Sequence, residues 1–230
     1  MGCVIVNWSF HGRAARRRWL AHCSALALTA VLAGHLPAWS VGAGQVRTVL
    51  VVGDSLSAEY GLPRGSGWVA LLEARLQRQQ LPARVVNASI SGDTTAGGRS
   101  RFAGLLAQHR PDIVVIELDG NDALRGLPLS MTEANLVSMT RDARAAGARV
   151  VLVGMQVPPN YGRRYADDFA ALFGRVAREE GAALVPFLLK GVADVAGADK
   201  LFQPDRIHPN AQAHPIILDN VWAVLKPLLG

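Results

Sequence analysis

Apolar runs alternate with amphipathic stretches along the chain from residue 46 onward. Five of the runs are short and rich in valine, isoleucine and leucine, which is typical of strands buried on both faces of a parallel sheet. They are Val46 to Gly53, Arg84 to Ala88, Asp112 to Leu118, Arg149 to Met155, and Ala182 to Phe187. Parallel neighbours must be joined by crossovers, and the longer segments between the runs supply them. The pattern therefore predicts an α/β fold: a three-layer α/β/α sandwich with a five-stranded parallel sheet.

The segments between the runs carry helical periodicity. Apolar residues recur at i, i+3 and i+7 in the first of them, at Val69, Leu72 and Leu76, and predict a helix that faces the core. Ser130 and Glu133 have the spacing of a capping box, which predicts a helix that begins there and runs to about Ala146, with Gly147 as its stop. Two more helices are predicted over Asp167 to Glu180 and over Ala211 to Leu228.

The first 43 residues differ from the rest of the chain. Four arginines precede an apolar span from about Trp19 to Ala33: Arg13, Arg16, Arg17 and Arg18. Small-residue sites follow, at Ala38-Trp39-Ser40 and Val41-Gly42-Ala43. These are the three parts of a secretory signal peptide. We expect cleavage after Ser40 or Ala43, so that 1–43 is a cleaved signal peptide and 44–230 is one periplasmic or secreted domain.

A retained membrane anchor is the competing interpretation of this leader. A spanning helix needs about 20 consecutive apolar residues. His22 and Cys23 interrupt the apolar span, which is also shorter than that length. We therefore expect no stable membrane span after cleavage.

The leader also accounts for the basic charge and for both cysteines. The formal net charge is +6, and without the four leader arginines 20 basic residues remain against 18 acidic ones. The domain therefore lacks the basic footprint that nucleic acid requires. Cys3 and Cys23 both lie in the leader. The mature chain thus has no thiol for a cysteine nucleophile, a disulfide or a thiolate zinc site.

The first predicted strand stops abruptly at Gly53-Asp54-Ser55. Ligands bind in open α/β folds at the edge where the strands end, so we expect Ser55 to lie at the ligand edge. A serine hydroxyl is a weak nucleophile and needs an adjacent base, commonly a histidine that is held by a carboxylate.

Three of the six histidines follow the leader, and elimination among these three selects the base. His109 comes just before a strand and therefore lies at the opposite edge, while His214 lies inside the last predicted helix. His208 occupies a loop, with Asp205 three residues before it. We infer that His208 is the base for Ser55 and that Asp205 orients its ring.

The oxyanion that such a reaction forms needs preorganised donors. Gly92 can bring its bare backbone N–H close to a ligand, and the side-chain amide of Asn121 does not titrate. The backbone N–H of Ser55 is the third candidate donor. Asp54, Asp93 and Asp122 lie in the same loops, and we expect them to order turns rather than to react.

Four blocks of the sequence resemble, in order, those of the GDSL or SGNH hydrolase family: Gly53-Asp54-Ser55-Leu56, the block around Gly92, Gly120-Asn121-Asp122, and Asp205-x-x-His208. Longer stretches resemble the branch that contains thioesterase I, lysophospholipase L1 and arylesterase: Asn87 to Thr95, Asn160 to Tyr165, and Ile207 to Asn210.

The resemblance covers nearly all of the mature chain, and it implies a flavodoxin-like sandwich. It also implies Ser55 as nucleophile, His208 as base, Asp205 as its partner, and Ser55, Gly92 and Asn121 as the oxyanion hole. The implied reaction is hydrolysis of fatty-acyl esters and thioesters, such as aryl esters, lysophospholipids and acyl-CoA-like substrates. It uses no metal or other cofactor, and we expect a monomer.

Two positions depart from the family pattern. Asp119 stands where this branch usually has glycine, and Arg206 stands where glycine is common between the aspartate and the histidine. Asp119 either brings a negative charge near the oxyanion hole or points away from it. Arg206 can form an ion pair either with Asp119 or with an acidic substrate. We expect these departures to alter substrate preference without removing activity.

The segment after the fourth predicted strand is the candidate substrate wall. Val157 and Pro158 are apolar and suit an acyl chain, and Arg163 is available for a headgroup. A solvent-exposed loop is the plainer interpretation of the same residues.

Three alternatives stay open. One is an acetylesterase that acts on cell-envelope polysaccharide, and another is a non-catalytic lipid- or glycan-binding protein. The third is a metal-dependent phosphoryl-transfer enzyme that uses Asp54, Asp119 and Asp122, because hard cations prefer carboxylates. This third alternative leaves Asn121, Asp205 and His208 without a role.

Overall fold

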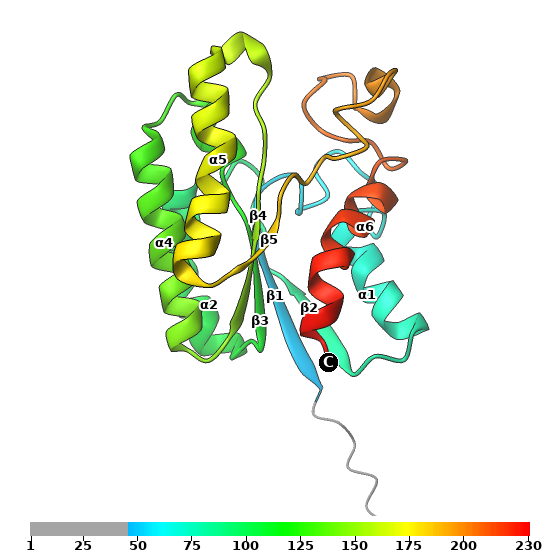
Figure 1. Cartoon of the computed structure of the whole chain (residues 1–230). Helices are drawn as coiled ribbons and strands as arrows, with labels where there is room; N and C mark the ends of the chain where they lie inside the picture. Colours follow the sequence, from blue (N-terminus) through cyan, green and yellow to red (C-terminus); the bar gives the residue numbers. More distant parts are fainter. Residues whose placement is uncertain (1–45) are drawn as a thin grey trace, which may run out of the picture. The chain divides into compact units, whose positions relative to one another are not determined.

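The computed structural model describes residues 46–230, so the predicted signal peptide lies outside the described residues. Five parallel strands form one sheet in the order β2-β1-β3-β4-β5 (Figure 1). The strands are β1 (Arg47–Gly53), β2 (Ala83–Asn87), β3 (Ile113–Glu117), β4 (Arg149–Val153) and β5 (Ala183–Val185). This strand order is flavodoxin-like. The predicted fold class is therefore confirmed.

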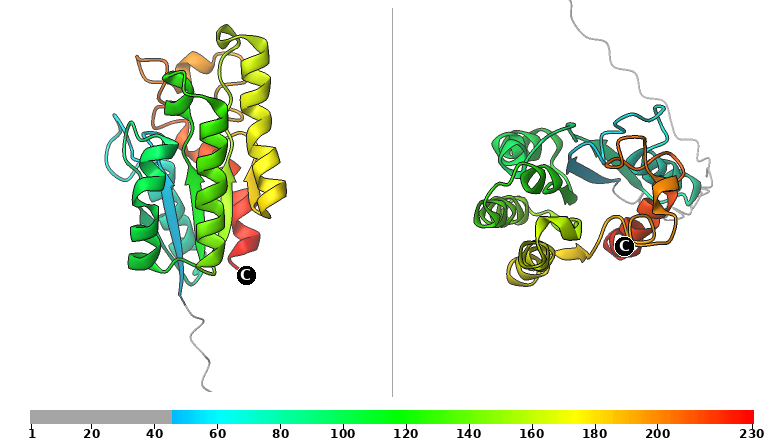
Figure 2. Two further views of the ribbon diagram at one scale, coloured as in Figure 1. Left: turned by 90° about the vertical axis from the view of Figure 1, so that its left-hand side faces the viewer. Right: turned by 90° about the horizontal axis from the view of Figure 1, so that it is seen from above.

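Helices cover both faces of the sheet (Figures 1 and 2). On one face lie α1 (Trp68–Arg78) and α6 (His214–Leu225), and on the other lie α2 (Thr95–His109), α4 (Leu129–Ala145) and α5 (Arg163–Glu180). The short helix α3 (Gly120–Leu124) follows β3 directly. Short 3-10 helices occupy Pro159–Tyr161, Ala198–Leu201 and Lys226–Leu228.

The core lies between these layers. Val49, Leu50, Val51 and Val52 of β1 are all fully buried, because β1 has a neighbouring strand on each side and helices on both faces. The predicted apolar stripe of α1 is also buried. The apolar run of β1 and the apolar stripe of α1 were thus predicted correctly from the sequence.

The predicted start of α4 was wrong. The residue before the helix is Pro128, and no side chain caps the first turn. Ser130 is therefore inside the helix, and Glu133 pairs with Arg175 of α5 at 3.2 Å instead of closing a capping box. The end was predicted well, because Gly147 follows the helix with a φ of +88°.

Two other helix boundaries also differ. Helix α5 begins at Arg163, four residues before the predicted start. Helix α6 begins at His214, because Ala213 donates its N–H to the Asn210 carbonyl and closes a turn first. Across residues 46–230, no helix has the length and apolar character needed to cross a membrane.

Two glycine substitutions test this packing with opposite signs. A Cβ on Gly154, just after β4, would lie 2.6 Å from the Pro186 carbonyl oxygen, so the backbone must shift. We expect Gly154→Ala to lower the free energy of unfolding by about 1–3 kcal/mol. Gly104 lies exposed within α2, with open space around it, and Gly104→Ala should raise the same quantity by about 0.5–1 kcal/mol. Urea unfolding of both variants checks this, and a stabilising Gly154→Ala contradicts it.

Candidate active site

The candidate site lies between β1 and β3, where the order in which the chain adds strands to the sheet changes direction. Strands β1 and β3 are neighbours, yet β1 leads to α1 on one face and β3 leads through α3 to α4 on the other. The segments after their carboxyl ends therefore diverge, which opens the crevice where ligands bind in such sheets. Ser55 follows β1 and Asn121 follows β3. The topology thus brings both candidate residues to one edge.

Ser55, His208 and Asp205 form a continuous chain of contacts. The Oγ atom of Ser55 lies 2.9 Å from Nε2 of His208, and Nδ1 of the same ring lies 2.7 Å from Oδ2 of Asp205. The other oxygen of Asp205 accepts the backbone N–H groups of Ile207 and His208, each at 3.0 Å. The structure thus brings together Ser55, which the turn after the first strand indicated, and the two residues that elimination selected.

The contacts of Asp205 favour its ionised form. Partial burial opposes ionisation, but the hydrogen bonds from the Ile207 and His208 backbone and from the His208 ring outweigh it. Together they lower the pKa of Asp205 from 3.8 to about 2. The carboxylate can therefore hold one ring nitrogen of His208 in its protonated form and leave Nε2 directed at Ser55.

Two of the predicted oxyanion donors are backbone N–H groups without an internal partner in the described chain. Within residues 46–230, the N–H groups of Ser55 and Gly92 make no hydrogen bond. Gly92 has a φ of +80°, a conformation that only glycine adopts readily, so its peptide direction depends on the missing side chain. Its carbonyl accepts a hydrogen bond of 2.8 Å from Arg125. These features suit an oxyanion donor at Gly92.

Asn121 is held differently. Its Nδ2 atom donates to Oδ2 of Asp54 and to the carbonyl of Asp93, both at 2.9 Å. An amide nitrogen carries two hydrogens, so both donors of Asn121 have internal partners. The predicted oxyanion donor is thus in place but engaged.

Asp54 orders the turn, as predicted. Its Oδ1 accepts the Leu56 backbone N–H at 3.0 Å, while its Oδ2 holds Asn121. Burial raises the pKa of Asp54 from 3.8 to about 6, although these two hydrogen bonds act in the opposite direction. A single carboxyl group therefore links the turn that carries Ser55 to the amide of Asn121.

Glu117, the last residue of β3, was missed by the sequence analysis. Its carboxyl group is buried, and its Oε2 accepts the Ser57 hydroxyl at 2.6 Å and the Asp54 backbone N–H at 3.3 Å. Burial and the neighbouring Asp54 and Asp119 raise its pKa. The available signal was a lone acid inside an apolar strand run. A Cβ on Gly53 would lie 2.6 Å from the same oxygen, which explains the glycine before Asp54.

Asp119 is buried, and its Oδ1 atom has no hydrogen-bond partner within the described chain. Burial, with the nearby Asp54 and Asp122, raises the pKa of Asp119 and favours its neutral form. Of the two partners left open for Arg206, Asp119 is not one in this structure: Arg206 is exposed, and no ion pair joins these two described residues. Arg206 itself has a φ of +58°, a left-handed backbone conformation that glycine adopts most readily.

The remaining loop carboxylates have structural partners. Asp122 accepts the Thr95 N–H at 2.9 Å and the Thr132 hydroxyl at 2.8 Å, and Asp93 pairs with Arg101 at 2.8 Å. The prediction that they order loops is confirmed. In the part of the chain from residue 46 onward, no group of three His, Cys, Asp or Glu residues has a geometry that could hold a metal ion.

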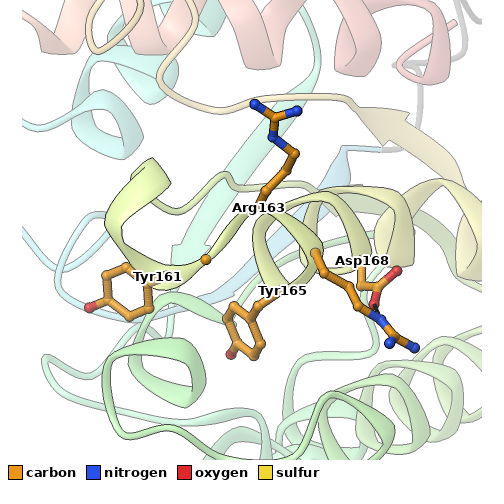
Figure 3. Close-up of a pocket in the computed structure, with 6 residues that line it drawn as sticks. Tyr161, Arg163, Tyr165 and Asp168 are labelled. Carbon is orange, nitrogen blue, oxygen red and sulfur yellow. Dashed lines mark ion pairs between the residues drawn. The ribbon is translucent and has the colours of Figure 1, made fainter.

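A shallow hollow lies beside the predicted substrate wall. Tyr161, Gly162, Arg163, Arg164, Tyr165 and Asp168 line its volume of about 480 Å³. Figure 3 shows the Tyr161 and Tyr165 rings on one side and Arg163 pointing away from them. Val157 and Pro158 are not part of this lining: Val157 packs partly against the core, and Pro158 is exposed. Ser55 and His208 are not among the residues that line the hollow.

The sequence matches the model of the GDSL-like lipase/acylhydrolase family over residues 51–216. The chain belongs to this family. Esterase TesA of Pseudomonas aeruginosa is 55% identical over 183 residues, which are 80% of this chain and 90% of that relative. The thioesterase 1/protease 1/lysophospholipase L1 of Escherichia coli K12 is 42% identical over 183 residues, 80% of this chain and 85% of its own.

A solved structure agrees with these sequence matches. The psychrotrophic esterase EstA from Pseudoalteromonas sp., in a form inhibited by monoethylphosphonate, superimposes with a TM-score of 0.75 at 39% identity. The match covers 80% of this chain and 98% of EstA. This GDSL hydrolase is thus a carboxylic ester hydrolase of the serine esterase and thioesterase type.

The buried Asp119 predicts how the stability of this GDSL hydrolase depends on pH. Because the pKa of Asp119 is raised in the folded state, folding takes up a proton once the pH exceeds the unfolded-state value of 3.8. The free energy of unfolding therefore falls as the pH rises, by at most about 1.4 kcal/mol per pH unit for one proton. We expect Asp119→Asn to lose less stability between pH 5 and pH 8 than the wild type.

Urea unfolding at the two pH values measures this difference. Asp142→Asn, on the exposed surface of α4, is the control and should retain the wild-type dependence. Equal slopes for the wild type and Asp119→Asn would show that Asp119 is ionised in the folded protein.

Proposed function

We propose that this hydrolase cleaves fatty-acyl esters and thioesters through an acyl-enzyme formed on Ser55. The observation that carries the proposal is the contact chain from Ser55 Oγ through the His208 ring to Asp205. His208 takes the hydroxyl proton as Ser55 attacks the carbonyl carbon. His208 then protonates the departing alcohol or thiol. Water repeats the sequence, which releases the acid and restores Ser55.

The oxyanion of each tetrahedral intermediate needs donors that are already directed at it. The free N–H groups of Ser55 and Gly92 supply two in this proposal. Asn121 becomes the third donor when it exchanges one hydrogen-bond partner. The N–H that donates to the Asp93 carbonyl then donates to the substrate oxygen instead. The bond to Asp54 meanwhile keeps the amide in position.

The names of the relatives support an acyl substrate, because one is an esterase and another is a thioesterase and lysophospholipase. We assign Val157 and Pro158 to the acyl chain and Arg163 to an anionic headgroup. Arg163 is exposed and forms no ion pair inside the described range, so its charge is available.

The proposed location follows from the leader. We propose that residues 1–43 direct export and are removed, which places the enzyme in the periplasm or outside the cell. The proposed enzyme acts as a monomer and requires no metal or cofactor.

The nucleophile is tested with p-nitrophenyl butyrate in the presence of EDTA. We expect Ser55→Ala to lower kcat by roughly 10⁴-fold or more, because no other group performs the nucleophilic step. Ser130→Ala, at an exposed position of α4, is the matched control and should retain wild-type activity. An organophosphonate should inactivate the wild type by modifying Ser55. Near-wild-type turnover by Ser55→Ala contradicts the mechanism, and loss of all activity with EDTA supports the metal-dependent alternative.

The acyl specificity is tested with p-nitrophenyl esters from acetate to palmitate. We expect kcat/KM to be higher for chains of six or more carbons than for acetate, because each buried CH₂ group contributes up to about 0.8 kcal/mol. An optimum at acetate favours the polysaccharide acetylesterase. The absence of hydrolysis of every ester favours the non-catalytic binding protein.

A further inference from the structure

Ser55 and His208 are 153 residues apart and lie on separate irregular segments. Ser55 belongs to the turn after β1, and His208 belongs to the long connection between β5 and α6. Asp205 orients the His208 ring, but it lies on the same segment and cannot fix its distance from Ser55. The 2.9 Å contact therefore needs a group that bridges the two segments.

We propose that Gln203 is that bridge: a positioning residue that sets the distance between Ser55 and His208. Its Nε2 donates to the Tyr60 carbonyl at 2.8 Å and to the Pro209 carbonyl at 3.1 Å. Tyr60 follows the nucleophile turn, and Pro209 is the neighbour of His208. Both hydrogens of one amide thus join the two segments. This inference rests on the proposed function, in which Ser55 and His208 act together.

The backbone of Gln203 fixes the histidine side of the bridge. Its N–H donates to the His208 carbonyl at 2.7 Å, and its carbonyl accepts the Arg206 N–H at 2.9 Å. Phe202 and Pro209 form an antiparallel bridge beside it. These contacts connect both ends of the loop that carries Asp205 and His208 to Gln203 and its neighbour.

Tyr60 fixes the serine side of the bridge. Its N–H lies 3.4 Å from the Ser55 carbonyl, and its ring packs against the His208 ring with 4.4 Å between centroids. A Cβ on the following residue, Gly61, would clash with Oε1 of Gln203. The side chain of Gln203 can reach the Tyr60 carbonyl because residue 61 is glycine.

Gln203→Met tests the role, because methionine keeps the unbranched length and removes both N–H donors. A misplacement of about 1 Å costs about 10²-fold in rate. We expect kcat for p-nitrophenyl butyrate to fall by about 10- to 100-fold, with KM changed by less than about twofold, because both amide hydrogens of Gln203 are bound to protein carbonyls. Inactivation by an organophosphonate should slow by a similar factor. Gln212→Met, at an exposed position nearby in sequence, is the matched control and should behave as the wild type.

Gln203→Glu adds a readout that a purely structural role would not move. An ionised carboxylate facing two carbonyl oxygens cannot donate, whereas the protonated acid regains one donor. The ratio of kcat for Gln203→Glu to kcat for Gln203→Met should therefore rise as the pH falls.

Melting temperatures and titration of active sites with the phosphonate separate the possible results. A lower melting temperature with wild-type kcat per titrated site would show that Gln203 only stabilises the fold, and would overturn the inference alone. A ratio that does not change with pH would also overturn it. Wild-type hydrolysis that survives Ser55→Ala would instead overturn the proposed function, and the inference with it.

Discussion

The hydrogen bonds that Glu117 accepts at the end of β3 hold the turn after β1. One buried carboxyl oxygen binds the Ser57 hydroxyl and the Asp54 N–H, and Ser57 in turn accepts the indole N–H of Trp68 at 3.2 Å. A buried polar group is costly unless it is hydrogen-bonded, so each member of this cluster requires the others. The side chain of Ser55 contacts His208 and does not hold its own turn in place. The position of Ser55 at the sheet edge therefore depends on the hydrogen bonds that Glu117 accepts.

The carboxyl groups around the site have opposed environments. Asp205 has its pKa lowered to about 2 by hydrogen bonds, whereas burial raises the pKa of Asp54, Glu117 and Asp119. Of these four acids, Asp205 is the one whose contacts favour the ionised form most strongly, and it faces His208. The pKa shifts of Glu117 and Asp119 favour their neutral forms, which limits the negative charge that these two buried acids add near the proposed oxyanion hole. Such a separation of pKa values is how acids of one chemical type perform different tasks.

The sequence predicted those parts of the molecule that are determined by residues close together along the chain. The valine-rich runs marked all five strands, and the turn at Ser55 and the Asp-x-x-His spacing marked residues that the fold brings together. The start of α4 was mispredicted, because Pro128 fixes the entry of the chain without a capping side chain. Glu117 was hidden in an apolar run. Gln203 bonds to the carbonyl of a residue 143 positions away, and a backbone acceptor leaves no trace in the sequence.

The long separation of Ser55 and His208 along the chain also bears on biosynthesis. Strand β1 is the first element of the described domain, but its neighbours β2 and β3 and the histidine loop are all made later. A nascent chain that ends between residues 55 and 207 contains the serine without its proposed base. The proposed active site therefore cannot form until nearly the whole domain has been synthesised.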